Sequence, residues 1–216
     1  MNDKLTDITM ILDRSGSMDT IADDVVGGVN DFIGQQRLAE GQARFTLIQF
    51  DTQDPHEVVH DAVDIQQVPG LTGYRPRSGT PLLDAVGTGI VRTGKRLAAM
   101  PEADRPGQVV FVIVTDGAEN SSTDFTLEKV RTMISEQESK YNWQFIFLAA
   151  DAQAFSEAAS YGFNADRSGQ VAKDGQSIRA SMNISSRKIA MYRQSNSLAD
   201  LDFNDDDRAT LSGETS

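Results

Sequence analysis

The chain has 216 residues, a net charge of −12 and no cysteine. A chain of this length can bury a large core without cross-links, and the lack of cysteine excludes disulfides, thiolate metal sites and cysteine nucleophiles. The negative charge disfavours a nucleic-acid partner, because most of such a surface would repel a phosphate backbone. Apolar runs such as 109–114 are far too short to cross a membrane. Residues 1–7 lack the apolar run of a signal peptide, so we expect a cytoplasmic protein that contacts no membrane.

In the first half of the chain, strand patterns and helix patterns alternate. An apolar run at 8–12 predicts a buried strand, and apolar residues spaced by about 3.6 positions from Ile21 to Ile33 predict a helix. Two strand-like runs follow between residues 45 and 65, close together around 51–55. This arrangement predicts an antiparallel hairpin at a sheet edge.

The second half of the chain repeats the alternation. Helical spacing begins at Leu82 and again at Leu127, and apolar runs at 109–114 and 143–148 predict two further strands. A last helical pattern ends about Arg193. Continuous apolar strands between helices are typical of a mostly parallel sheet covered on both faces, so we predict one α/β domain over residues 1–194.

Residues 195–216 have a different composition from the rest of the chain. From Leu198 to the end there are six acidic side chains and one basic side chain, and large apolar residues are few. Such a segment cannot bury enough apolar surface to offset the entropy lost on ordering. We therefore predict an acidic, disordered C-terminal tail.

Side chains that carry oxygen follow two of the predicted strands and precede one helix. Asp13, Ser15 and Ser17 alternate in the loop after the first strand, Thr80 precedes the helix that begins at Leu82, and Asp116 follows the strand at 109–114. In a doubly wound sheet, ligands bind outside the carboxyl ends of the strands. We therefore expect these three loops to face one crevice.

An all-oxygen set of this kind favours a hard divalent cation. We expect Mg²⁺, with Mn²⁺ or Ca²⁺ as substitutes, held by Asp13, Ser15, Ser17, Thr80 and Asp116. Only two of the five side chains are carboxylates, and Mg²⁺ usually keeps several waters, so one position would stay open. An incompletely neutralised cation with an open position attracts a carboxylate from outside, which predicts a binding module that needs no catalytic base.

The same residues resemble the metal-ion-dependent adhesion site of the von Willebrand factor A domain. The likeness rests on Asp-x-Ser-x-Ser at 13–17, Thr80 within Ser-Gly-Thr-Pro-Leu, and Thr-Asp-Gly at 115–117. It implies a Rossmann-like, doubly wound, six-stranded sheet of order 3-2-1-4-5-6 with one antiparallel edge strand and helices on both faces. It also implies a non-catalytic module that binds a protein partner through the metal, with an Asp or Glu of the partner as the ligand.

The resemblance covers about residues 5–193 in the order of the elements. The segments 147–155 and 190–193 look like the compact single-domain bacterial and phage members of the family. Some of those members resemble tellurite-resistance-associated proteins, which hints at a stress response, at phage biology or at work beside an ATPase.

Other interpretations of these motifs stay open. Each loop alone also fits an ordinary turn or helix cap. Residues 56–60, His-Glu-Val-Val-His, match a zinc-peptidase pattern, but the valines and Pro55 favour a strand. Histidines at both ends of a four-residue stretch of strand are about 13 Å apart, too far to share one ion, so we expect an edge strand with exposed histidines.

A second enzyme alternative is a Mg²⁺-dependent phosphatase that uses Asp13 as its nucleophile. Such enzymes usually need a second Asp two positions later as the general acid, and Ser15 stands there. Lys129 could act as a phosphate-binding lysine, but nothing in the sequence places it at the site.

Overall fold

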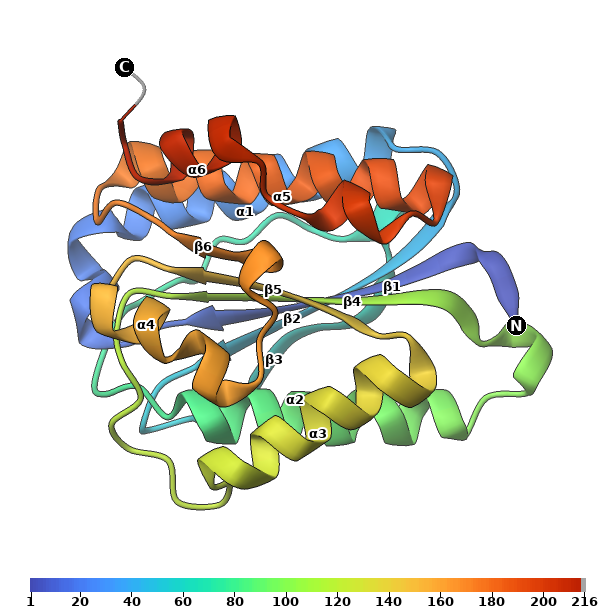
Figure 1. Ribbon diagram of the computed structural model, residues 1–216, viewed down its shortest axis with the longest axis horizontal. Helices are drawn as coiled ribbons and strands as arrows, with labels where there is room; N and C mark the ends of the chain where they lie inside the picture. Colours follow the sequence, from blue (N-terminus) through green and yellow to red (C-terminus); the bar gives the residue numbers. More distant parts are fainter. Residues whose placement is uncertain (215–216) are drawn as a thin grey trace.

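The computed structural model describes residues 1–214. Its centre is a six-stranded sheet of order β3-β2-β1-β4-β5-β6, with helices on both faces (Figure 1). All neighbouring strands are parallel except β2 and β3, which are antiparallel. The predicted strand order and the antiparallel edge strand are confirmed. The strands are β1 (Asn2–Asp13), β2 (Gln42–Phe50), β3 (Glu57–Asp64), β4 (Pro106–Thr115), β5 (Gln144–Ala149) and β6 (Ser168–Gln170).

Two helical layers cover the sheet. One layer contains α1, α5 and α6, and the other contains α2, α3 and α4 (Figure 1). None of the helices in residues 1–214 has the length and apolar character needed to span a membrane. The helices are α1 (Ala22–Leu38), α2 (Leu82–Ala98), α3 (Leu127–Tyr141), α4 (Ala152–Tyr161), α5 (Gly175–Ser195) and α6 (Asp205–Leu211).

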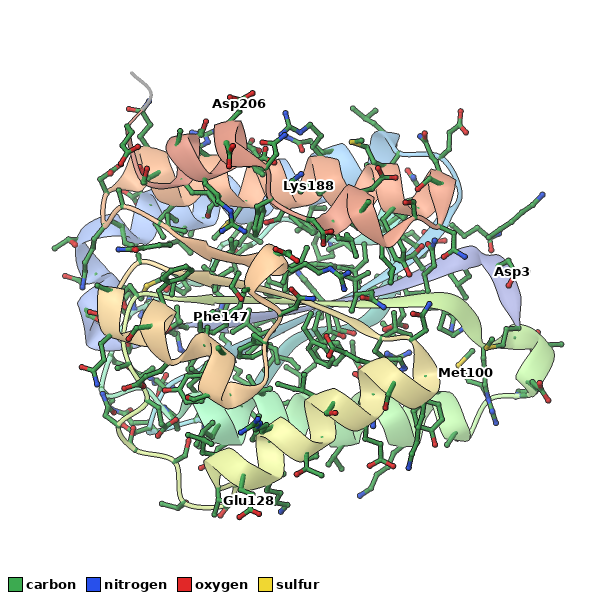
Figure 2. The ribbon with its side chains drawn as sticks, in the orientation of Figure 1. Asp3, Met100, Glu128, Phe147, Lys188 and Asp206 are labelled. Carbon is green, nitrogen blue, oxygen red and sulfur yellow. The ribbon has the colours of Figure 1, made fainter. Side chains whose placement is uncertain are left out.

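The apolar runs of the sequence are explained by this double cover. Alternate residues of a strand point to opposite faces of the sheet. In β1, Met10 and Leu12 therefore pack in the core beneath α1 and α5, while Ile11 packs in the core beneath α2. Phe147 of β5 lies in the interior on the side of α4, whereas Asp206 of α6 lies on the outer surface (Figure 2). Strands buried on both faces need apolar residues at every position.

The register of the strands brings three chain segments together where the parallel strands β1, β2 and β4 have their carboxyl ends. Asp13, the last residue of β1, lies opposite Phe50 of β2. Val114 of β4 lies opposite the residue before Asp13. The segments that begin at Asp51 and at Asp116 therefore leave the sheet beside the end of β1.

The hairpin predicted between residues 45 and 65 is confirmed, but the exposure predicted for its histidines is wrong. His60 lies in β3, is buried, and has its ring 6.5 Å from the ring of Phe45. His56 precedes β3 and is half-buried. An edge strand still turns one face to the core, and apolar residues after it, among them Ile65 and Val68, pack on the same core.

The disorder predicted for the C-terminal segment is also wrong for residues 195–214. A short 3-10 helix (Leu198–Leu201) and α6 pack against α5, and Leu201, Phe203 and Leu211 are buried in the core. The fold thus continues past residue 194, the predicted end of the domain. The composition hid this because three well-spaced apolar residues suffice to dock the segment. The last two residues of the predicted tail, 215–216, lie outside the described part.

Two of the six acidic side chains of this segment form ion pairs, whereas Asp205, Asp206 and Glu214 are exposed. Asp207 is buried and forms ion pairs with Lys188 at 2.7 Å and Arg187 at 2.6 Å, both on α5. Asp202 pairs with Arg167 at 2.9 Å. Asp207 also completes a capping box with Asn204 at the start of α6. These two acidic residues are therefore part of the docking contact.

Candidate metal-binding site

Asp13 is held at the carboxyl end of β1 by bonds to both of its carboxylate oxygens. The backbone N–H of Ser15 donates to Asp13 Oδ1 at 2.7 Å, and Thr115 Oγ1 donates to Asp13 Oδ2 at 2.6 Å. The Asp13 side chain is completely buried. Its carbonyl oxygen accepts a hydrogen bond from the hydroxyl of Tyr74. The aspartate that opens the loop is thus fixed between the ends of β1 and β4.

Two serines of the same loop meet the carboxylate of Asp116. Ser15 Oγ and Ser17 Oγ lie 3.1 Å apart. Ser17 Oγ donates to Asp116 Oδ1 at 2.6 Å, and Ser15 Oγ lies 3.5 Å from the same oxygen. Asp116 is buried just past the end of β4. The fold therefore brings together three oxygen donors from two distant parts of the sequence.

Thr80 completes the predicted set at Gly117. A Cβ placed on Gly117 would lie 3.2 Å from Thr80 Oγ1 and 3.9 Å from Ser17 Oγ. Glycine at this position lets the threonine hydroxyl approach the backbone that follows Asp116. The backbone N–H of Thr80 donates to Asn120 Oδ1 at 3.0 Å, so the threonine is fixed from the same loop. All five predicted residues lie at one edge of the sheet.

Backbone bonds join the first loop to the segment that carries Thr80. The N–H of Arg77 donates to the carbonyl of Arg14 at 2.9 Å, and the N–H of Gly16 donates to the carbonyl of Ser78 at 3.0 Å. Ser78 has a positive φ of 61°. The two segments therefore run side by side, joined by these two backbone hydrogen bonds. This pairing sets the distance between the serines and Thr80.

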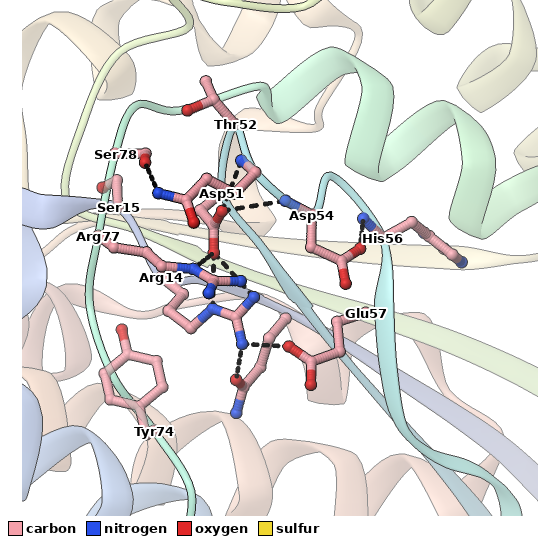
Figure 3. A network of polar contacts seen from close by, with 12 residues as sticks. Arg14, Ser15, Asp51, Thr52, Asp54, His56, Glu57, Tyr74, Arg77 and Ser78 are labelled. Carbon is pink, nitrogen blue, oxygen red and sulfur yellow. Dashed lines mark hydrogen bonds and ion pairs between the residues drawn. The ribbon is translucent and has the colours of Figure 1, made fainter.

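A buried ion-pair network supports the site from the side of β2 (Figure 3). Asp51 accepts hydrogen bonds from Arg14 Nε at 2.8 Å and from Arg77 Nε at 2.9 Å. It also accepts the backbone N–H groups of Gln53 at 2.7 Å and Asp54 at 3.0 Å. Burial alone would raise the pKa of Asp51, but these hydrogen bonds lower it below its usual value. One carboxylate thus ties three loops together.

The loop after β4 is fixed to the start of α2 by two acidic side chains. Asp84 is buried and accepts the backbone N–H groups of residues 123, 124 and 125 at 2.8, 2.9 and 2.8 Å. Glu119 accepts the N–H of Leu83 at 2.9 Å. Because Thr80 lies just before α2 and Asp116 lies just before this loop, these bonds keep the two residues together.

The electrostatic balance of the site suits a cation. The pKa of Asp13 is raised to about 6: burial raises it most, hydrogen bonds from Thr115 and Ser15 lower it in part, and the nearby charge of Asp116 raises it further. Asp116 Oδ2 is buried and accepts no well-aligned hydrogen bond within residues 1–214. Two close buried carboxylates, one with an oxygen that accepts no well-aligned hydrogen bond, fit a hard cation with oxygen ligands.

Sequence reasoning missed a lysine at this site. Lys173, in the segment between β6 and α5, places its Nζ 3.0 Å from Asp116 Oδ2. No spacing pattern could have indicated it, because β6 has only three residues and carries no strand signal. Arg14 and Asp51 were also missed, although each had a signal. Arg14 stands inside the Asp-x-Ser-x-Ser motif, and Asp51 follows a buried strand directly.

The two enzyme alternatives find less support in the geometry. Glu57 and His60 lie on β3 and not on the helix that a zinc peptidase requires. Within the described chain, no group of three or more His, Asp or Glu side chains is arranged to hold a metal. Lys129, considered for the phosphatase, lies with its Nζ 4.0 Å from the centre of the Phe125 ring. Any metal here would depend on the serine and threonine hydroxyls.

No family model and no curated protein sequence matches the chain. Solved structures do match it. Proximal thread matrix protein 1 from the mussel byssus is 14% identical with a TM-score of 0.57, over 86% of this chain and 46% of that chain. A von Willebrand factor type A protein from Catenulispora acidiphila is 13% identical with a TM-score of 0.57, over 86% and 42%. The manganese-loaded TRAP protein of Plasmodium vivax is 14% identical with a TM-score of 0.54, over 79% and 69%.

This chain spans less than half the length of the mussel and Catenulispora chains that it matches. Another structure of the mussel protein is described as having a zinc-occupied metal-ion-dependent adhesion site motif. At sequence identities this low, the structural similarities establish the fold and not the activity. Together with the observed strand order, they show that this chain has the fold of a von Willebrand factor A domain.

Proposed function

We propose that the chain is a protein-binding module that depends on a divalent cation, with Mg²⁺ as its ion. The observation that carries the proposal is the convergence of Ser15, Ser17 and Asp116, with contacts of 2.6–3.5 Å, beside Thr80 and Asp13. Similar folds with zinc or manganese bound add support. In this proposal Asp116 and the hydroxyls of Ser15, Ser17 and Thr80 hold the ion, and the buried carboxylate of Asp13 adds negative charge beside them.

The ion would supply positive charge and an open coordination position. The side chains provide two carboxylates and three neutral hydroxyls, which leaves a divalent ion short of ligands. The natural ligand for the open position is a carboxylate. We therefore propose that the partner is a protein that offers an Asp or Glu side chain.

A binding role explains the state of Asp13 better than catalysis does. A phosphatase would need Asp13 as an exposed nucleophile, yet both of its carboxylate oxygens accept hydrogen bonds and the side chain is buried. Both histidines of the chain belong to the β2–β3 hairpin, so neither stands in the three loops as a base. We propose that the site has no catalytic activity.

The proposal is tested by titrating Mn²⁺ and Mg²⁺ into the wild type and into a Ser15→Ala/Ser17→Ala variant. We expect the wild type to bind one ion and the variant to lose binding. Saturating ion should also stabilise the wild type, by about 2.7 kcal/mol at a hundredfold excess over Kd. Thr132→Ala removes a hydroxyl from the exposed face of α3 and is the matched control. Equal affinity in all three proteins would place the ion elsewhere.

A second measurement addresses the partner and the absence of catalysis. We expect a protein captured from the native host to be released by chelator and to bind Thr80→Ala more weakly. Capture that persists in chelator would move the interface away from the ion. Hydrolysis of a generic phosphomonoester by the Mg²⁺-loaded protein, lost in Asp13→Asn, would favour the phosphatase instead.

The cytoplasmic location and the likeness to bacterial, phage or tellurite-resistance-associated proteins remain predictions.

A further inference from the structure

The segment between β6 and α5 carries a cation into the proposed metal site. Lys173 Nζ lies 3.0 Å from Asp116 Oδ2. Within residues 1–214, this is the one ion pair found at Asp13 or Asp116. The Asp116 side chain is fully buried, whereas the Lys173 side chain is 47% exposed. The charged end of the lysine therefore reaches inward from the rim to the carboxylate.

The backbone on either side of Lys173 is fixed by three other elements. The N–H of Val171 donates to the carbonyl of Ala149 in β5 at 2.8 Å, and the N–H of Ala172 donates to the carbonyl of Leu211 in α6 at 2.8 Å. Asp174 caps α5 by accepting the N–H of Ser177 at 2.8 Å. Because the backbone is held, the freedom of the lysine lies in its flexible side chain.

The two oxygens of Asp116 have different partners. Oδ1 is shared by Ser15 and Ser17, the hydroxyls of the proposed ion ligands. Among the described residues, the partner found for Oδ2 is the ammonium group of Lys173, without a well-aligned hydrogen bond. A contact that rests on charge alone is easily exchanged for another cation, since a half-exposed lysine can return to water at small cost.

We infer that Lys173 is a tethered cation that neutralises Asp116 in the metal-free protein and competes with the divalent ion for that carboxylate. This inference rests on the proposed function, because it takes Asp116 to be an ion ligand. The lysine sets how much free metal is needed to load the site. When the ion binds, the ammonium group moves toward the rim, and the loaded site carries one more positive charge than its two carboxylates balance. That charge favours an acidic partner over a neutral one.

The experiment compares Mn²⁺ affinity in the wild type, Lys173→Met and Lys173→Arg. Methionine keeps the length of the side chain and removes the charge, whereas arginine keeps the charge. We expect Lys173→Met to bind Mn²⁺ about three- to tenfold more tightly, and Lys173→Arg to stay within about twofold of the wild type. The matched control is Lys140→Met, which removes the same charge from an exposed ion pair on α3.

A second readout follows the ion pair without metal. In chelator, Lys173→Met should melt at a lower temperature than the wild type, because it leaves the buried carboxylate of Asp116 without its counter-charge. In an Asp116→Asn background the same substitution should have no effect, because there is no charge to neutralise. A packing role for the lysine would instead lower the melting temperature equally in both backgrounds, and this result would overturn the inference.

The outcomes separate this inference from the function on which it rests. If the wild type binds Mn²⁺ and Lys173→Met binds it equally or less tightly, the metal site stands and the competition is wrong. If neither protein binds Mn²⁺, the proposed metal site is itself wrong and the competition falls with it. Tighter binding in Lys140→Met as well would reduce the effect to the net charge of the protein, which also overturns the role of Lys173.

Discussion

The hydroxyl of Thr115 donates to Asp13 Oδ2 at 2.6 Å across 102 positions of sequence. Thr115 is the last residue of β4, and Asp13 is the last residue of β1. Both side chains are completely buried. The bond therefore links the carboxyl ends of β1 and β4 beside the proposed ion site. It also gives Asp13 Oδ2 a partner in the buried interior.

Replacing Thr115 with Val should destabilise the protein by about 1–3 kcal/mol, because a buried carboxylate loses a hydrogen bond without gaining access to water. Urea unfolding in chelator measures this directly. Thr115→Ser keeps the hydroxyl and should cost less. If Thr115→Val is as stable as the wild type, the bond contributes nothing to stability and Asp13 is held by the N–H of Ser15 alone.

The pH dependence of stability should report Asp13. Burial raises its pKa in the folded chain to about 6, above the ordinary value of 3.8. Between these pH values the folded protein binds a proton that the unfolded chain does not, so stability falls as pH rises and levels off above about pH 7. Relative to Asp13→Asn, the wild type in chelator should therefore lose about 2–3 kcal/mol between pH 4 and 7.

The comparison with Asp13→Asn removes the contribution of other groups. The pKa values of His56 and His60 are lowered, chiefly by burial, so these residues change stability in the opposite direction over part of this range. They are present in both proteins and cancel in the difference. A difference that does not change with pH would show that the pKa of Asp13 is close to its ordinary value. With metal present, affinity should fall as pH drops below about 6, because the ion competes with the proton.

The sequence predicted the parts of the fold that repeat a simple pattern. The runs at 8–12 and 109–114 are apolar at nearly every position because β1 and β4 are covered on both faces, and the loops after them carry the oxygens. The five candidate ligands are identifiable because a cation needs specific atoms at the ends of specific strands. Their common edge follows from the parallel register.

The parts that were missed depend on single contacts and not on repeats. Lys173 reaches Asp116 from a segment whose position is set by a three-residue strand and by α6. The C-terminal segment looks disordered by composition, yet its buried Asp207 pairs with two basic residues of α5. Net charge and mean hydropathy average over such pairs, so neither quantity can reveal them.

Leu211→Ala should test whether the C-terminal segment belongs to the folded domain. The side chain is fully buried in the core shared with α5, and a cavity of this size costs about 2–5 kcal/mol. For a chain of this length that corresponds to a drop of about 4–20 °C in Tm. Leu198→Ala makes the same substitution at an exposed position in the same segment and is the control. Equal melting of both variants would mean that the segment is not docked in solution.

The last prediction concerns Asp51, which connects Arg14 and Arg77 beneath the site. Asp51→Asn removes the charge between two arginines, one of them buried, and should destabilise the protein by about 3–5 kcal/mol. The matched control is Asp61→Asn, which breaks an Asp–Arg pair of similar length that is exposed on both sides and should cost about 1 kcal/mol or less. Because Arg14 lies between Asp13 and Ser15, Asp51→Asn should also weaken Mn²⁺ binding, whereas Asp61→Asn should leave it unchanged. Urea unfolding and Mn²⁺ titration of the two variants separate these effects. If Asp51→Asn is destabilised but binds Mn²⁺ with wild-type affinity, the network supports the fold without positioning the ligands, and the loop at 13–17 must be held in place by its backbone bonds to residues 77 and 78.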